Sequence, residues 1–158
     1  MKTGPHQAPC PGVTPYLCVA GAGDAIRFYR EVFGAEEHVR LLDPDGRVVH
    51  AEISVGPARL VLREEDREAG LLGPKAIGGT PVTLEVRVED ADAVLTRAVA
   101  AGATPSCMPE DRRPLRCGGQ FEDPFGHRWT VCALDRHVPV PGIRAVLAAV
   151  KGADRPPP

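Results

Sequence analysis

The chain contains an internal repeat with a spacing of 68 to 69 residues, and this repeat limits the folds that are open to it. Two amphipathic helices are predicted, at 24–33 and 92–101, because apolar side chains recur there with helical spacing. Gly34 and Gly102 end these helices, as glycine commonly does. The helix starts and the two glycines are each 68 residues apart, and a strand precedes each helix, at 16–19 and 84–88. We therefore expect two copies of one structural unit.

Each predicted helix is followed by further strands, so that each half reads β-α-β-β-β. In the first half these strands are predicted at 38–42, 48–55 and 59–63, and the turn Asp43-Pro-Asp-Gly46 joins the first two. The second half contains the related turn Asp123-Pro-Phe-Gly126, followed by a strand at 127–133. The sequence therefore predicts an α+β fold with modules at 13–63 and 82–137, joined by a linker at 64–81.

Both ends of the chain are rich in proline. Four of the 17 prolines fall in residues 1–15 and five in residues 139–158, so we expect a flexible tail at 1–12 and a disordered C-terminus. Within 138–158, a short amphipathic helix is predicted at 142–151, with apolar positions Ile143, Val146, Leu147 and Val150. This helix could dock on the body of the protein or on a second subunit.

Composition removes several classes of function. The formal net charge is −2, which supplies no basic face for nucleic acid. No apolar run approaches the roughly 18 residues that a membrane span requires. Residues 1–12 contain no apolar stretch typical of a secretory signal, so we expect a cytoplasmic protein whose five cysteines are reduced.

Several motifs together resemble the vicinal oxygen chelate superfamily. They are Val13-Thr-Pro-Tyr-Leu17, Phe28-Tyr29, Phe33-Gly-Ala35, His50-Ala-Glu52 and Asp123-Pro-Phe-Gly-His-Arg-Trp129. This superfamily includes glyoxalases, bleomycin resistance proteins and extradiol dioxygenases, and the chain is most similar to its PhnB-like branch. The resemblance covers about residues 12–137. It implies that the two modules form a cupped, incomplete barrel and that the protein is a homodimer, either swapped or unswapped.

The resemblance also locates the positions at which metal-dependent members hold their ion. These positions fall at Thr14, Val61, Thr83 and Thr130. Hydroxyl groups and a valine do not replace imidazole and carboxylate ligands for zinc, nickel, iron or manganese. We therefore expect no metal and no other cofactor, and we expect no Lewis-acid chemistry of the kind that metal-dependent members use.

Alternation along the strands assigns the remaining cup residues. On the strand at 48–55, Val49, Ala51, Ile53 and Val55 are predicted to face the core, which leaves His50, Glu52 and Ser54 on the other side. In the second half, Leu84, Val86, Val88, Trp129 and Val131 are predicted to pack on helices. The predicted ligand-binding residues are Thr14, Tyr16, Glu52, Val61, Arg63, Thr83, Arg87, Arg116, Thr130 and Cys132.

Two residues are candidates for acid–base catalysis. His50 shares a strand face with Glu52, so the carboxylate could orient the imidazole. The same pair could instead be a solvated strand face, a dimer contact or an unorthodox metal site. Glu85 could be a general base buried in the cup, or it could form an ion pair with Arg63 or Arg87. Arg116 belongs to a glycine-containing loop that is either a lid over the cup or a solvated loop.

These observations favour a metal-independent small-molecule binding protein of the glyoxalase/bleomycin-resistance type, with antibiotic sequestration as its function. The alternative is a lyase, isomerase or cyclase that uses Glu85 or His50 as its acid and base. A third hypothesis is a protein-interaction module that has lost its ligand. The sequence leaves enzymatic activity and the identity of the ligand open.

Overall fold

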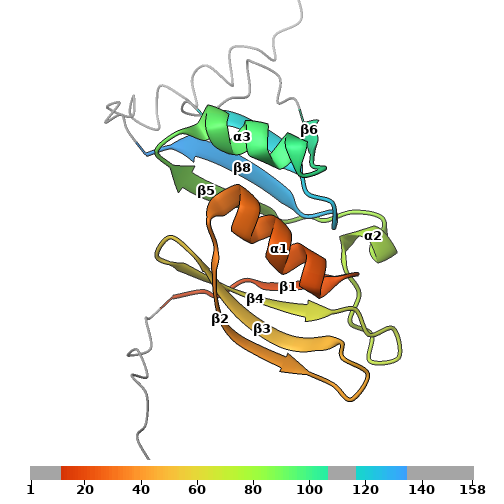
Figure 1. The fold of residues 1–158 in the computed structure, drawn as a ribbon. Helices are drawn as coiled ribbons and strands as arrows, with labels where there is room; N and C mark the ends of the chain where they lie inside the picture. Colours follow the sequence, from red (N-terminus) through yellow and green to blue (C-terminus); the bar gives the residue numbers. More distant parts are fainter. Residues whose placement is uncertain (1–11, 107–116, 135–158) are drawn as a thin grey trace, which may run out of the picture.

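The computed structural model describes residues 12–106 and 117–134 of the chain (Figure 1). In the first module, β1 (Tyr16–Val19), α1 (Ala22–Phe33), β2 (Glu36–Leu42), β3 (Val48–Val55) and β4 (Ala58–Glu64) follow one another. The short helix α2 (Pro74–Ile77) lies in the linker. The second module consists of β5 (Thr83–Val88), α3 (Ala91–Ala100), β6 (Thr104–Ser106), β7 (Cys117–Glu122) and β8 (Arg128–Ala133).

The strands form two four-stranded mixed sheets, in the orders β1-β4-β3-β2 and β5-β8-β7-β6. In each sheet the first pair is parallel and the other pairs are antiparallel. The two sheets are separate and form no closed barrel. The predicted α+β fold with two β-α-β-β-β units is therefore confirmed, and α2 is an addition that the sequence reading did not anticipate.

The strand register repeats along with the elements. Tyr16 of β1 pairs with Val61 of β4, and Glu85 of β5 pairs with Thr130 of β8. Both members of the second pair lie 69 residues after those of the first (85 − 16 and 130 − 61). Equivalent positions in the two sheets can therefore be compared directly.

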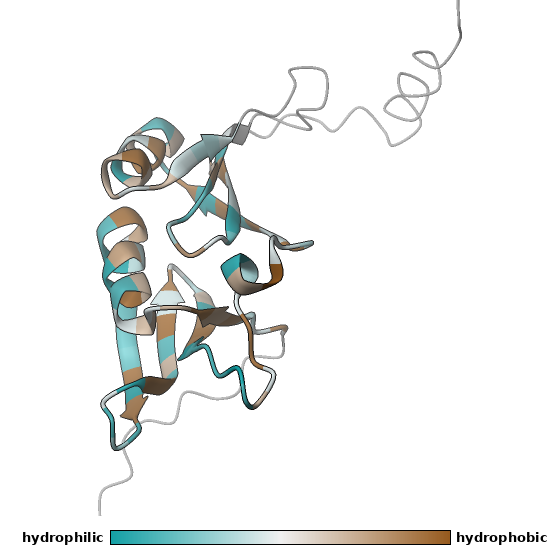
Figure 2. Cartoon of the chain, turned by 90° about the vertical axis from the view of Figure 1, so that its right-hand side faces the viewer, coloured by the Kyte–Doolittle hydropathy of each residue, from teal (hydrophilic) through white to brown (hydrophobic). Residues whose placement is uncertain are grey.

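Helix α1 connects the two modules through its aromatic side chains. It packs on the strands of its own sheet and on α3, and Figure 2 shows the two main helices stacked on the same side of the molecule. Tyr29 and Phe33 also reach Trp129 of the second sheet, with ring centroids 5.4 Å and 4.7 Å apart. Burying large aromatic rings in this way supplies much of the packing energy of a small domain. The core is therefore shared by both modules, and Trp129 packs on a helix as predicted.

A buried carboxylate lies at the centre of this shared core. Asp123 is 3% exposed, and its Oδ2 accepts hydrogen bonds from Tyr29 Oη at 2.6 Å and Trp129 Nε1 at 2.9 Å. Its Oδ1 accepts from the backbone N–H groups of Phe125 and His127, both at 2.9 Å, and so shapes the β7–β8 turn. Burial raises the pKa of Tyr29 well above its usual value, and burial lowers the pKa of His127.

One predicted core residue lies on the surface. Val49 is 39% exposed, whereas its neighbour Val48 is 4% exposed. The cause is a register shift between β2 and β3: Leu41 pairs with His50 but Leu42 pairs with Val48, so Val49 has no partner. Such a bulge shifts the alternation by one residue. Beyond the bulge, Ala51 and Ile53 are fully buried as predicted.

The linker is held tightly against the first module. Gly73 is buried, and its N–H donates to Glu65 Oε1 at 2.8 Å. A Cβ at this position would lie 2.6 Å from the carbonyl oxygen of Cys18. The predicted C-terminal helix at 142–151 and nearly all of the N-terminal tail lie outside the described residues. Within the residues described, no helix is long and apolar enough to cross a membrane.

Candidate functional site

The face of the first sheet that lies away from the helices carries a chain of hydrogen-bonded polar side chains. Tyr16 Oη lies 2.7 Å from His50 Nδ1, and His50 Nε2 lies 3.3 Å from Glu52 Oε1. Arg59 Nη1 donates to the second carboxylate oxygen, Glu52 Oε2, at 2.9 Å. We call this face, with Tyr16, His50, Glu52, Arg59 and Arg63, the first open face.

This chain of contacts assigns the proton positions. A carboxylate only accepts hydrogen bonds, so the proton on His50 lies on Nε2 and is directed at Glu52. The lone pair of Nδ1 then accepts the hydroxyl proton of Tyr16. The pairing of His50 with Glu52 that the sequence suggested is therefore present, and Tyr16 extends it. Tyr16 is 57% exposed, so its hydroxyl group is accessible from solvent.

Val61 lies beneath this chain. The register places it between Tyr16 and Glu52, and it is only 7% exposed although it is on the open face. Arg63 follows two residues later on the same strand face and pairs in register with Cys18. Burial raises the pKa of the Cys18 thiol, and the positive charge of Arg63 acts against this rise. Thr14 is exposed, just before β1 begins.

The corresponding face of the second sheet, which we call the second open face, carries Thr83, Glu85, Arg87, Gln120 and Thr130. Arg87 Nε donates to Glu85 Oε1 at 3.0 Å, with the two side chains 71% and 50% exposed. Glu85 is therefore not buried within one chain, and the expected ion pair is with Arg87 and not with Arg63. Thr130 is 6% exposed and accepts a hydrogen bond from Gln120 Nε2 at 2.6 Å. Thr83 is exposed.

Cys132 differs from expectation. It is 7% exposed and disulfide-bonded, whereas Cys18 is free. The prediction that all cysteines are reduced is therefore wrong for Cys132. Arg116 and most of the predicted lid loop lie outside the described residues.

The structure thus brings the predicted residues together as two groups. Tyr16, Glu52, Val61 and Arg63 share the first open face, and Thr83, Glu85, Arg87 and Thr130 share the second. Between these two faces, no hydrogen bond or ion pair joins side chains of the residues described. Arg59 and Gln120 were not among the predicted site residues. Alternation along β4 places Arg59 on the same face as Val61, whereas Gln120 lies beside Thr130 because β7 and β8 pair at that position.

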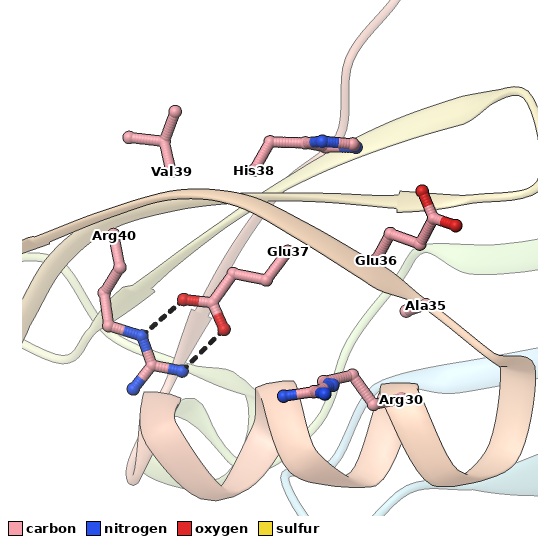
Figure 3. A pocket seen from close by; sticks show the side chains of 7 residues that line it. All are labelled: Arg30, Ala35, Glu36, Glu37, His38, Val39 and Arg40. Atoms are coloured by element: carbon pink, nitrogen blue, oxygen red, sulfur yellow. Dashed lines mark hydrogen bonds and ion pairs between the residues drawn. The ribbon is translucent and has the colours of Figure 1, made fainter.

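A different hollow, of about 500 Å³, lies between α1 and β2 (Figure 3). There Arg40 binds Glu37 through two hydrogen bonds, Nε to Oε1 at 2.5 Å and Nη2 to Oε2 at 2.9 Å. These hydrogen bonds lower the pKa of Glu37. His38 and Val39 project from the other side of β2. Since the carboxylate of Glu37 and the guanidinium group of Arg40 neutralise each other, this hollow is a weaker candidate site than the first open face.

The donor atoms of the two open faces do not fit the metal that many relatives use. The four corresponding positions hold Thr14, Val61, Thr83 and Thr130, and two of these side chains are buried beneath their neighbours. Across residues 12–106 and 117–134, no group of three or more His, Cys, Asp or Glu side chains is arranged to hold a metal ion. Transition metals in proteins are bound by such groups.

A family model for the glyoxalase-like domain matches residues 16–132. The chain belongs to the glyoxalase-like domain family. An uncharacterized protein of Mycobacterium tuberculosis is 34% identical over 142 residues, which cover 88% of this chain and 84% of that protein.

Solved structures of other proteins share this fold. An Arabidopsis thaliana gene product is similar with a TM-score of 0.66 and 29% identity, covering 78% of this chain and 98% of that one. The fosfomycin resistance protein FosX of Listeria monocytogenes is similar with a TM-score of 0.58 and 17% sequence identity. The alignment covers 80% of this chain and 94% of FosX. A PhnB protein of Bacillus cereus is similar with a TM-score of 0.56 and 18% sequence identity. The alignment covers 77% of this chain and 98% of the PhnB protein. With its match to the glyoxalase-like family model, the chain is a member of the vicinal oxygen chelate superfamily, as its motifs suggested.

Proposed function

We propose that this glyoxalase-like chain is a metal-independent small-molecule binding protein and that it sequesters an antibiotic or a related compound. The observation that carries the proposal is the register of the two sheets. It makes Val61 and Thr130 equivalent positions. The resemblance implies that metal-dependent members hold a metal ligand at these positions. Hydrogen-bonding side chains surround both positions, so the faces offer polar contacts that can orient a small molecule.

The proposal includes a homodimer in the cytoplasm. One chain presents its two open faces as separate surfaces, and neither is part of the hollow between α1 and β2. A ligand gains affinity when most of its surface is buried. A second chain that covers these faces would provide such enclosure. The fosfomycin resistance function named for FosX is consistent with an antibiotic ligand, although the likeness to FosX is one of fold.

Metal analysis and ligand binding test this proposal together. We expect protein purified without added ions to contain substoichiometric zinc, nickel, iron and manganese. We also expect calorimetry against a panel that includes fosfomycin and bleomycin to find a binder whose affinity is unchanged by a chelator. Stoichiometric metal held by side chains of the open faces would overturn metal independence. The absence of binding across the panel would overturn antibiotic sequestration.

A second candidate function, acid–base catalysis, is favoured by the hydrogen bonds of His50. Glu52 orients the imidazole and Nδ1 is directed at the hydroxyl group of Tyr16. His50 could therefore accept the Tyr16 proton while the phenol oxygen takes a proton from the substrate. Glu85 has no comparable arrangement, because its carboxylate is half exposed and paired with Arg87. The structure therefore favours His50 over Glu85 as the acid–base residue of a lyase, isomerase or cyclase.

Substitution of the two candidates separates binding from catalysis. If the protein is an enzyme that uses His50, His50→Gln should lower kcat about 100-fold or more, as the loss of a general base typically does. Glu85→Gln, on the second open face, should then leave kcat nearly unchanged. If the protein only binds its ligand, both variants should change the affinity alone. Loss of turnover in Glu85→Gln with His50→Gln fully active would contradict the assignment of His50.

A further inference from the structure

Arg63 differs from the other basic residues of the first open face because none of the described carboxylates forms an ion pair with its guanidinium group. Its Nε atom is buried and has no hydrogen-bond partner in the part of the chain that the structure describes. A buried N–H group without an acceptor is uncommon in folded proteins and calls for an explanation. Arg59, by contrast, donates to Glu52 on the same face.

The carboxylates around Arg63 are occupied by other partners. Both oxygens of Glu52 are taken, one by His50 and the other by Arg59. Glu64 accepts the N–H groups of Gly21 and Ala22 at 2.6 Å and 2.8 Å and so caps the start of α1. Glu65 accepts the N–H group of Gly73. These three side chains are directed at other groups, and none of them forms an ion pair with the guanidinium group of Arg63.

The strand register brings Arg63 close to the hydrogen-bonded side chains of Tyr16, His50 and Glu52. Ala51 pairs with Leu62 and Glu52 pairs with Val61, so extending the pairing by one residue sets Arg63 opposite His50 on the same side of the sheet. Residues directly opposite in an antiparallel pair have Cα atoms about 4.5 to 5.5 Å apart. A molecule held by Arg63 would therefore lie within reach of His50 and of the Tyr16 hydroxyl group.

We propose that Arg63 is the anion-binding group of this face and that the ligand is a small molecule carrying a carboxylate or phosphate-type oxyanion. The inference rests on the proposed function, since it names the chemical class of ligand for the same site. The Nε–H and one Nη–H of a guanidinium group form a planar edge that matches two oxygens of a carboxylate or phosphate. Such an oxyanion supplies the acceptor that Nε lacks.

Nuclear magnetic resonance of the full chain labelled with ¹⁵N tests the inference through the Nε–H signal of Arg63, assigned with the Arg63→Gln variant. The probes are benzoate, inorganic phosphate and benzamide, the last of which is an uncharged counterpart of benzoate. We expect benzoate or phosphate to shift the Arg63 signal in a saturable manner. Tighter binding of benzoate than of phosphate would assign a carboxylate ligand, and the reverse order a phosphate.

Two arginine variants make the result specific. Arg63→Gln should weaken binding of the preferred anion about tenfold or more, as expected for the loss of a charge-assisted hydrogen bond. Arg27→Gln is the matched control, because Arg27 lies on the exposed surface of α1 and pairs with Asp24. It should leave the affinity unchanged. Melting temperatures of both variants close to that of the wild type would show that the fold is retained.

The inference and the proposed function can fail separately. Benzamide binding as tightly as benzoate, or anion binding that is unaffected by Arg63→Gln, would overturn the role of Arg63. Failure of both anions to shift the Arg63 signal would overturn it as well. If the antibiotic panel nevertheless yields a binder that perturbs Tyr16 or His50, the proposed function stands and only the anionic class of ligand is wrong.

Discussion

Replacing Asp123 with alanine is expected to lower the free energy of unfolding by about 3 to 5 kcal/mol, because buried donors lose charge-assisted hydrogen bonds worth roughly 1.5 to 3 kcal/mol each. Tyr29 Oη and Trp129 Nε1 would both be left without an acceptor in the shared core. Urea denaturation monitored by circular dichroism measures the change, with the slope of the transition checked for two-state behaviour.

The repeat supplies a matched control for this variant. Asp43 occupies the related turn of the first module, where its Oδ1 accepts from the N–H groups of Asp45 and Arg47 at 3.0 Å and 2.8 Å. It has no buried tyrosine or tryptophan donor. Asp43→Ala should therefore cost only about 1 kcal/mol, a typical net value for such hydrogen bonds. Equal losses in the two variants would show that the turn, and not the buried network, is what Asp123 stabilises.

Gly73→Ala is the second substitution with a large expected effect. Its added Cβ would lie 2.6 Å from Cys18 O and 2.7 Å from Glu65 Oε1, so the linker would have to move away from β1. We expect a loss of about 2 to 3 kcal/mol, near the upper range for overpacking a tight site. Differential scanning calorimetry would record the loss as a lower melting temperature.

Gly119→Ala is the comparison for this steric effect. There the added Cβ would lie 2.8 Å from Leu95 Cδ1, at the far end of a flexible side chain that can change rotamer. This variant should be affected much less than Gly73→Ala. If the two variants lose similar stability, contact with a backbone carbonyl is not the reason that position 73 requires glycine.

Much of the fold could be predicted from local patterns. Strand β3 has the bounds expected from its alternation, and the glycines after the helices mark their ends. The outward orientation of Val49 could not be predicted, because the bulge depends on pairing with β2 and not on the sequence of β3 itself. The short helix α2 was missed since its four residues are too few to show a period.

The site was predicted less completely than the fold. Alternation placed His50 and Glu52 on one face, but the hydrogen bond from Tyr16 to His50 crosses from β1 to β3 and depends on the order of the strands. The same is true of Arg59, which reaches Glu52 from a neighbouring strand. The disulfide bond of Cys132 was missed because cysteine spacing alone does not reveal which side chains meet.

Strand β4 keeps its structural residues and its open-face residues on opposite sides of the sheet. Leu60 and Leu62 are buried in the core, at 5% and 0% exposure, whereas Arg59, Val61 and Arg63 alternate with them on the other side of the sheet. Mutations on that side leave the contacts of the two leucines intact. Substitutions on the first open face can therefore change which groups that face presents, while the packing of Leu60 and Leu62 on the other side of β4 is kept.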